Sequence, residues 1–438
     1  MRIATIIRHC KSPAMVVATM FICFQVQVQA QYYEPGYLRY QDHVYADHIQ
    51  TVLLHREGWE LSNPWLEMGS QDQLRLSFDD LRAGVINYKY RYIHCNANWQ
   101  PSDLLPADYL EGFYEDDIIT YLPSYNTIQD YTHYTVVFPS ERMAPKLSGN
   151  YLLIVYEATD PDHPVITLRF MIFESLVNIQ GRVHAATDIN ERDYRQEIDF
   201  RIEQGGYIIE QPYRDMQVIL LQNERWDNAI TNLKPLMVRD RILDFNLDFG
   251  NVFDGGNEFR HFDIKSLRFN SDRIAQITDP SGVFEVILHP DIRRPFQVYT
   301  RLQDINGRRF IRNDNGSDSR VEAEYVRVHF TLPYEAPIAH GDIFVFGALT
   351  QWQFLPSAKM QYDFTRRAYR TSLYLKQGYY NYMYMLVEEG KTMGDQGFIE
   401  GNHEETENDY VIMVYNRETG SRYDRLIGLK QLNSLKDR

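Results

Sequence analysis

The 438-residue sequence contains little cysteine: three residues, at positions 10, 23 and 95. Two of them, Cys10 and Cys23, lie in an N-terminal segment that we expect to be removed during export. A chain left with Cys95 alone cannot form an internal disulfide, so core packing must hold the fold together even in an oxidising compartment. We therefore predict that Cys95 is a small buried hydrophobic residue.

Positive charge is also scarce, with 45 Lys and Arg against 60 Asp and Glu and a formal net charge of −15. Removal of Arg2, Arg8 and Lys11 with the N-terminal segment would take that charge to −18. A chain this acidic is poorly suited to nucleic acid or to anionic lipid surfaces, because both repel it. The balance favours a basic protein partner and excludes nucleic acid.

Long apolar runs are missing except near the N-terminus. Residues 14–24 are apolar, too few to span a bilayer, and they follow a basic stretch and precede Val28-Gln29-Ala30. This pattern predicts a signal peptide over residues 1–30, cleaved after Ala30, and export to the periplasm. Cys23 follows Ile22, so a lipoprotein signal is not expected. No later segment suggests direct insertion into a membrane.

Helical stripes are absent too, whereas aromatic residues are abundant, with 32 Tyr and 23 Phe. Aromatic side chains favour the half-buried surface of a sheet. Residues 73–78 alternate with a period of two, which places Leu74, Leu76 and Phe78 on one face of a strand. Short strands separated by turn residues predict an all-β fold of tandem immunoglobulin-like β-sandwich domains. We expect three such domains, at residues 31–175, 176–320 and 321–438.

One long polar segment, residues 96–125, interrupts the strands of the first domain. Connections of this length are uncommon inside a compact domain and are often functional. It concentrates aromatic side chains among acidic ones, a composition that suits a reversible protein interface with a few aromatic anchors. The candidate partner-binding residues are Trp99, Tyr109, Glu111, Phe113 and Tyr114. The alternative is a loop whose aromatic side chains fold back on themselves.

Catalytic and metal-binding motifs are not recognisable. The sequence has no Gly-x-Ser-x-Gly elbow, no Cys-x-x-Cys pair and no phosphate-binding glycine loop. His403 and Glu404 begin like a zinc-protease helix, but no second histidine follows at the required spacing. The acidic cluster Glu111, Glu115, Asp116 and Asp117 is the best candidate for a hydrolase. We favour an ordinary acidic surface there, and we expect no enzyme activity, no metal and no cofactor.

The third domain is similar to the glycogen-binding type of immunoglobulin-like module. The similarity rests on residues 343–352, which end in Trp352, and on residues 375–382, which include Tyr380. In that family exposed aromatic residues stack on sugar rings, so a periplasmic carbohydrate-binding protein that uses Trp352 and Tyr380 is the alternative function. We favour ordinary core or rim positions for both residues, because a fold can persist without its binding site.

A longer series of motifs resembles the plug protein family of the type IX secretion system. In the first domain the motifs are at residues 78–81, 92–99, 101–104, 109–113, 131–134 and 145–151; later ones are at 222–228, 263–269, 400–410 and 423–428. The resemblance implies a non-enzymatic periplasmic protein that docks on the inner mouth of an outer-membrane translocon barrel. It would close that pore while no cargo is passing. We expect it to be monomeric in isolation and held at the inner face of the outer membrane through its partner.

Overall fold

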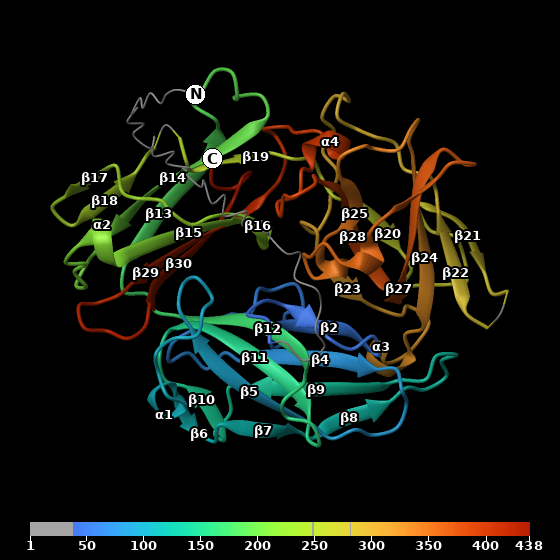
Figure 1. Cartoon of the computed structure of the whole chain (residues 1–438), viewed down its shortest axis with the longest axis horizontal. Coiled ribbons are helices and arrows are strands. Elements are labelled where there is room, and N and C mark those ends of the chain that lie inside the picture. Colours follow the sequence, from blue (N-terminus) through green and yellow to red (C-terminus); the bar gives the residue numbers. More distant parts are fainter. Residues whose placement is uncertain (1–37, 248, 281) are drawn as a thin grey trace, which may run out of the picture.

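The computed structural model describes residues 38–438 except 248 and 281. The predicted signal peptide and its cleavage site therefore lie outside the described residues. The described chain is built from β-strands with only single-turn helices, which confirms the all-β prediction. It forms three two-sheet sandwiches, with the second and third lying side by side above the first (Figure 1). Among the described residues no helix has the length and apolar character needed to cross a membrane.

The first sandwich pairs two sheets over a core of Leu, Ile, Tyr and Phe side chains. Its first sheet has the order β1 (His43–Val44), β12 (Pro164–Phe173), β11 (Gly149–Glu157), β5 (Tyr88–Cys95) and β7 (Glu115–Ile118), with β3 (Trp65–Glu67) beside β12. Its second has the order β2 (Ile49–Arg56), β4 (Leu74–Asp80), β9 (Thr132–Phe138) and β8 (Thr120–Pro123). The short helix α1 (Pro106–Tyr109) and the pair β6 (Leu110–Gly112) and β10 (Met143–Pro145) close one end.

The second sandwich contains the C-terminal strands. One sheet has the order β13 (Asn178–Ala185), β14 (Arg195–Glu203), β18 (Ile242–Phe245) and β17 (Met237–Arg239), with β19 (Val252–Asp254) beside β14. The other has the order β16 (Arg225–Ile230), β15 (Met216–Gln222), β29 (Asp409–Asn416) and β30 (Arg425–Asn433). Helix α2 (Pro212–Asp215) precedes β15.

The strands of the third sandwich lie, in sequence, between these two parts of the second. One sheet has the order β20 (Arg260–Asp263), β28 (Gly378–Val387) and β23 (Arg309–Ile311), with β25 (Asp342–Phe346) also on β28. The other has the order β21 (Ile274–Thr278), β22 (Phe284–Leu288), β24 (Tyr325–Pro333), β27 (Ala368–Lys376) and β26 (Gln361–Asp363). The helical turns are α3 (Ser319–Glu322), η1 (Ala348–Thr350), η2 (Pro356–Ala358) and α4 (Gly397–Glu400).

The sheets do not follow the expected division at residue 320. Strands β20 to β23 precede that residue but pair within the third sandwich, and β29 and β30 return to the second sandwich beside β15. In Figure 1 the red C-terminal strands accordingly lie with the green strands of the second sandwich. The third sandwich is thus an insertion into the second, because the hydrogen-bonding partner of β15 lies almost 200 residues further along the chain.

The first and second sandwiches meet through an apolar joint. Cys95, Leu152 and Met171 from the first sandwich form one buried cluster with Met413 and Tyr415 from the second. Cys95 is fully buried, as predicted, and burial raises the pKa of its thiol to about 12. The side chains of this joint exclude water as a domain core does.

The first and third sandwiches meet through a polar joint. Asp79 of β4 is 0% exposed, and one of its carboxylate oxygens accepts hydrogen bonds from Lys376 Nζ and Tyr325 Oη, each at 2.6 Å. The other oxygen lies 2.6 Å from His133 Nδ1. The Lys376 side chain is 1% exposed and its ammonium lies 4.1 Å from the centre of the Tyr131 ring. Further directional contacts lie beside this carboxylate: Arg309 donates to the carbonyl of Val52 at 2.6 Å, and the Tyr131 hydroxyl donates to the carbonyl of Ala323 at 2.9 Å.

Candidate partner-binding surface

The structure divides the five predicted partner-binding residues into two groups, and the first group is inside the protein. Trp99 is 3% exposed and packs edge-on against Trp226 of the second sandwich, with ring centres 5.5 Å apart. Tyr109 is 4% exposed, and its hydroxyl donates to the carbonyl of Tyr92 at 3.1 Å. Neither side chain can contact a partner in this structure, because both are occupied in packing the chain's own sandwiches.

The other three residues lie on the surface at one edge of the first sandwich. Glu111 is exposed on β6, and Phe113 and Tyr114 are 60% and 55% exposed in the turn that leads into β7. The Arg142 guanidinium lies 5.3 Å from the centre of the Phe113 ring and leaves its other face uncovered. The aromatic pair is therefore available to another protein.

This edge carries a concentration of exposed apolar side chains, which we call the edge strip and define as residues 105–128. Eight of the 26 large hydrophobic side chains that are exposed within the described residues fall there: Leu105, Phe113, Tyr114, Ile119, Tyr121, Leu122, Tyr125 and Ile128. Figure 1 shows β6, β7 and β8 along the lower edge of the first sandwich. The two ends of the strip reach the other sandwiches: Asp108 pairs with Arg422 of the second, and the Tyr125 N–H donates to the carbonyl of Val321 in α3 (Ser319–Glu322). Apolar patches of this kind mark interaction sites.

Half of the predicted long loop, residues 96–125, is regular structure. Residues 115–118 form β7 and residues 120–123 form β8, so one extended run crosses from the edge of one sheet to the edge of the other at Ile119. Their sequences, Glu-Asp-Asp-Ile and Thr-Tyr-Leu-Pro, lack the alternation of buried strands. The buried positions of β7 alternate with exposed ones, but one of them holds Asp116, paired with Arg142, and all four residues of β8 are exposed, so no apolar alternation indicated either strand.

Glu115 and Asp116 of the edge strip are held by ion pairs with basic side chains. Glu115 accepts hydrogen bonds from Lys89 Nζ at 2.7 Å and from Tyr156 Oη at 2.5 Å, and Arg142 Nε donates to Asp116 at 3.0 Å. The bond from Lys89 lowers the pKa of Glu115. A glycosidase needs one carboxyl group with a raised pKa as its general acid, and Glu115 is shifted in the opposite direction. The cluster thus supplies negative charge to the surface.

The two residues of the carbohydrate alternative do not form an aromatic platform. Tyr380 is 1% exposed, stacks on Phe262 at 5.2 Å and donates its hydroxyl hydrogen to the carbonyl of Lys376. Trp352 is partly buried and packs edge-on against Phe346 and Phe259. A sugar ring cannot stack on Tyr380, because its faces are already covered by the core of the third sandwich.

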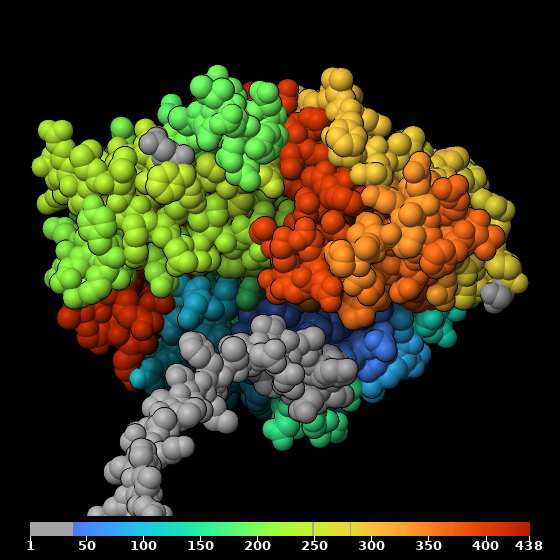
Figure 2. Space-filling model, turned by 45° about the horizontal axis from the view of Figure 1, so that its top comes forward, coloured from blue at the N-terminus to red at the C-terminus, as the bar shows by residue number. Residues whose placement is uncertain are grey.

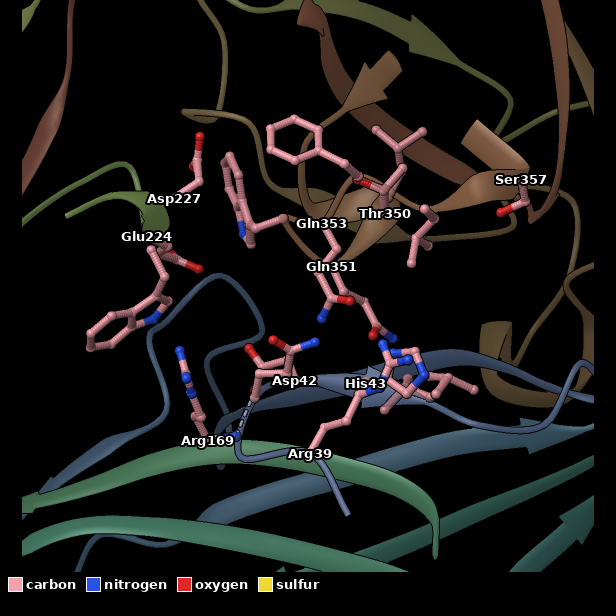
Figure 3. A pocket seen from close by; sticks show the side chains of 18 of the residues that line it. Arg39, Asp42, His43, Arg169, Glu224, Asp227, Thr350, Gln351, Gln353 and Ser357 are labelled. Atoms are coloured by element: carbon pink, nitrogen blue, oxygen red, sulfur yellow. Dashed lines mark hydrogen bonds between the residues drawn. The ribbon is translucent and has the colours of Figure 1, made fainter. Parts of the chain in front are cut away.

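A cavity of about 1500 Å³, which the sequence did not indicate, lies where the three sandwiches meet. Figure 3 shows Asp42 and Arg169 of the first sandwich facing Glu224 and Asp227 of the second and Gln351 and Gln353 of the third. The Arg169 guanidinium lies between the rings of Trp99 and Trp226, 4.4 and 4.9 Å from their centres. Burial lowers the pKa of Arg169 to about 10 and raises that of Asp42, which accepts a hydrogen bond from the Arg169 backbone N–H. These groups join the sandwiches to one another.

Within the described residues, His184, Glu197 and Asp199 form one group with ligand atoms within 4.8 Å of one another. Their hydrogen-bonding capacity is used inside the chain. His184 Nε2 lies 2.9 Å from Asp199, whose carboxylate also accepts from Arg182, and Glu197 accepts from the Thr187 N–H. The bond to Asp199 raises the pKa of His184, which favours the protonated ring over the neutral one that binds metals. The group is an ion-pair network.

Comparison with known proteins gives two matches. The family model described as the first domain of the type 9 secretion system plug protein matches residues 49–174, which run from β2 to the end of β12 in the first sandwich. A crystal structure of a hypothetical protein from Parabacteroides merdae is 34% identical, with a TM-score of 0.88, over 91% of this chain and 100% of that one. Among curated proteins none matches the chain.

Proposed function

The chain belongs to the type IX secretion system plug protein family, and on that premise we propose that it docks on the outer-membrane translocon from the periplasm and plugs its pore when cargo is absent. The family gives the chain a role in type IX secretion. The proposal has four further parts. The partner is the outer-membrane translocon barrel, and the protein is periplasmic at the inner face of the outer membrane. It is monomeric when free and has no catalytic activity.

The observation that carries the docking proposal is the edge strip. Between its two ends it gathers exposed aromatic and aliphatic side chains at one edge of the first sandwich, among them Phe113, Tyr114 and Ile119. Aromatic anchors within a polar surround are the usual composition of an interface that must form and release. Within the strip the partner-binding residues we propose are Glu111, Phe113 and Tyr114, whereas Trp99 and Tyr109 support the fold beneath them.

Rigidity is the second requirement of a plug. Three sandwiches joined by a buried apolar cluster, a buried ion pair and the insertion of one sandwich into another form a stiff body. A body of this kind can obstruct a wide pore without deforming, because packed cores have low compressibility.

The test uses a bacterium that encodes this protein and carries a deletion of its gene. We expect a bulky probe that the outer membrane normally excludes to enter the deletion strain, and we expect the wild-type gene to restore exclusion. A tagged copy should co-purify with the translocon barrel, and the double variant Phe113→Ser, Tyr114→Ser should lose that association. Ile208→Ser, Tyr213→Ser, a pair of similar exposure on the second sandwich, is the control. Absence of the barrel from the purified wild-type material would contradict the proposal.

A further inference from the structure

Strand β8 is an edge strand with both faces partly exposed: Tyr121 is 42% exposed and lies against the Tyr134 ring at 5.9 Å, and Leu122 is 38% exposed. It pairs with β9 only, at the end of the order β2-β4-β9-β8, and all four of its residues are exposed. An edge strand in a sandwich normally buries one face against the opposite sheet. Because neither face of β8 is buried, it presents side chains as well as backbone groups to solvent.

The hydrogen-bond alternation shows which backbone groups of β8 are free. Ser124 N donates to the carbonyl of Tyr131, and the next pair in the register is Pro123 with Thr132. Hydrogen-bonded and non-hydrogen-bonded pairs alternate in an antiparallel ladder, so Leu122 and Thr120 bond to β9 while Tyr121 and Pro123 point their backbone groups outward. Pro123 is at a position where the missing N–H would face solvent, as edge prolines do.

The neighbouring edge strand differs from β8 in charge. Strand β7 exposes Glu115 and Asp117, and charged side chains of this kind protect an edge from pairing with other chains. Strand β8 has no charged residue and is flanked by Ile119, which is 80% exposed. The two edge strands are continuous through Ile119. The edge at β7 is protected by charged side chains, whereas the edge at β8 is not.

Resting on the proposed docking function, we propose that β8 binds its partner by strand addition. The ligand is an extended segment of the translocon that carries apolar and basic side chains. Its backbone pairs with the outward groups of Tyr121 and Pro123, its apolar side chains cover Tyr121 and Leu122, and its basic side chains lie near Glu115 and Asp117. Strand addition to an open sheet edge gives affinity through main-chain hydrogen bonds and specificity through alternate side chains. The charge of −15 on this chain favours the basic partner.

The first experiment compares two substitutions at one position, with the full chain and the detergent-purified translocon. Tyr121→Ala and Tyr121→Pro remove the same ring, but only the proline removes the outward N–H. We expect Tyr121→Pro to bind about five- to tenfold more weakly than Tyr121→Ala, the effect of one lost hydrogen bond. We also expect the Tyr121 amide of the wild-type chain to exchange with deuterium more slowly in the complex.

A second variant tests the proposal independently if Tyr121→Pro fails to fold. Ile119→Lys places a positive charge beside β8 and should weaken binding about tenfold, because it blocks pairing and repels a basic segment. Ile189→Lys is the matched control, since Ile189 is 82% exposed on the second sandwich, and it should bind as the wild type does.

The outcomes separate the two proposals. Wild-type binding with equal affinities for Tyr121→Pro and Tyr121→Ala, and no slowing of Tyr121 exchange, would overturn strand addition and leave docking intact. A wild-type chain that does not bind the translocon would overturn both. Self-association of the free protein that Ile119→Lys abolishes, measured by analytical ultracentrifugation, would assign the edge to a second copy of this chain and overturn the basic partner.

Discussion

The two joints of the first sandwich are made in different ways. The joint to the second sandwich is a cluster of apolar side chains, whereas the joint to the third surrounds one buried carboxylate, Asp79, with hydrogen-bond donors. Apolar packing is non-directional and tolerates small shifts. A buried ion pair is stable only in good geometry, because both charges have been taken out of water. The difference teaches that the orientation of the third sandwich on the first is set by directional polar contacts, whereas that of the second is set by the fit of apolar side chains.

The largest effect is expected from breaking the polar joint. Asp79→Ala leaves the Lys376 ammonium buried without its counter-ion and should lower the free energy of unfolding by about 3–5 kcal/mol. Urea unfolding followed by tryptophan fluorescence measures this loss. The double variant Asp79→Leu, Lys376→Met is the comparison, and it should recover most of the stability because it removes both charges. A double variant as unstable as Asp79→Ala would show that the unpaired charge of Lys376 is not the cause of the lost stability.

The apolar joint is tested by two leucines on one strand. Leu152 and Leu153 of β11 are both fully buried, but Leu152 faces the second sandwich and Leu153 the core of the first. Each Leu→Ala change should cost about 2–4 kcal/mol, since each leaves a cavity in close-packed surroundings. Equal losses in urea unfolding would show that the joint is packed as tightly as a core. A loss below about 1 kcal/mol for Leu152→Ala alone would contradict that description.

Acid should weaken the polar joint selectively. Burial alone would raise the pKa of Asp79, but Lys376 and His133 hold it below its ordinary value of 3.8. Below about pH 4 the unfolded chain therefore binds a proton at Asp79 that the folded chain does not, and the free energy of unfolding falls as the pH falls. Unfolding measured between pH 5 and pH 3 should show a shallower decline in Asp79→Asn. If the free energy of unfolding declined equally with pH in the wild type and in Asp79→Asn, protonation of Asp79 would not be the cause of the acid sensitivity.

The smallest effect is expected at the rim of the apolar joint. Arg422 of the second sandwich lies 2.9 Å from Asp108 in α1, with both side chains open to solvent. Asp108→Asn should leave the unfolding temperature almost unchanged, because water and salt screen exposed pairs. Thermal unfolding at low and high salt checks this, and an unfolding temperature lowered as far as in Leu152→Ala would mean that this rim stabilises the joint as much as its packing does.

Several features were predictable because they depend on local sequence. The alternation at residues 73–78 indicated β4, and Leu74, Leu76 and Phe78 are all fully buried. The burial of Cys95 followed from the chemistry of cysteine, which without a disulfide partner behaves as a small hydrophobic residue. In the segment 96–125 the structure leaves Phe113 and Tyr114 exposed, and their role in partner binding stays a prediction.

The remaining features required contacts between distant residues. Periodicity shows that a segment is a strand but does not identify its neighbour, so the sequence did not indicate that β29 would pair with β15 around an inserted sandwich. Burial of Trp99 depends on Trp226 and Arg169, which come from other strands.

The sequence by itself indicated the all-β fold and the family, because the period of a strand and the family's motifs can both be recognised in short stretches of consecutive residues. Only the tertiary structure decided which edge is open. An edge is defined by the strand that is absent beside it, and that absence follows from how all the sheets are paired.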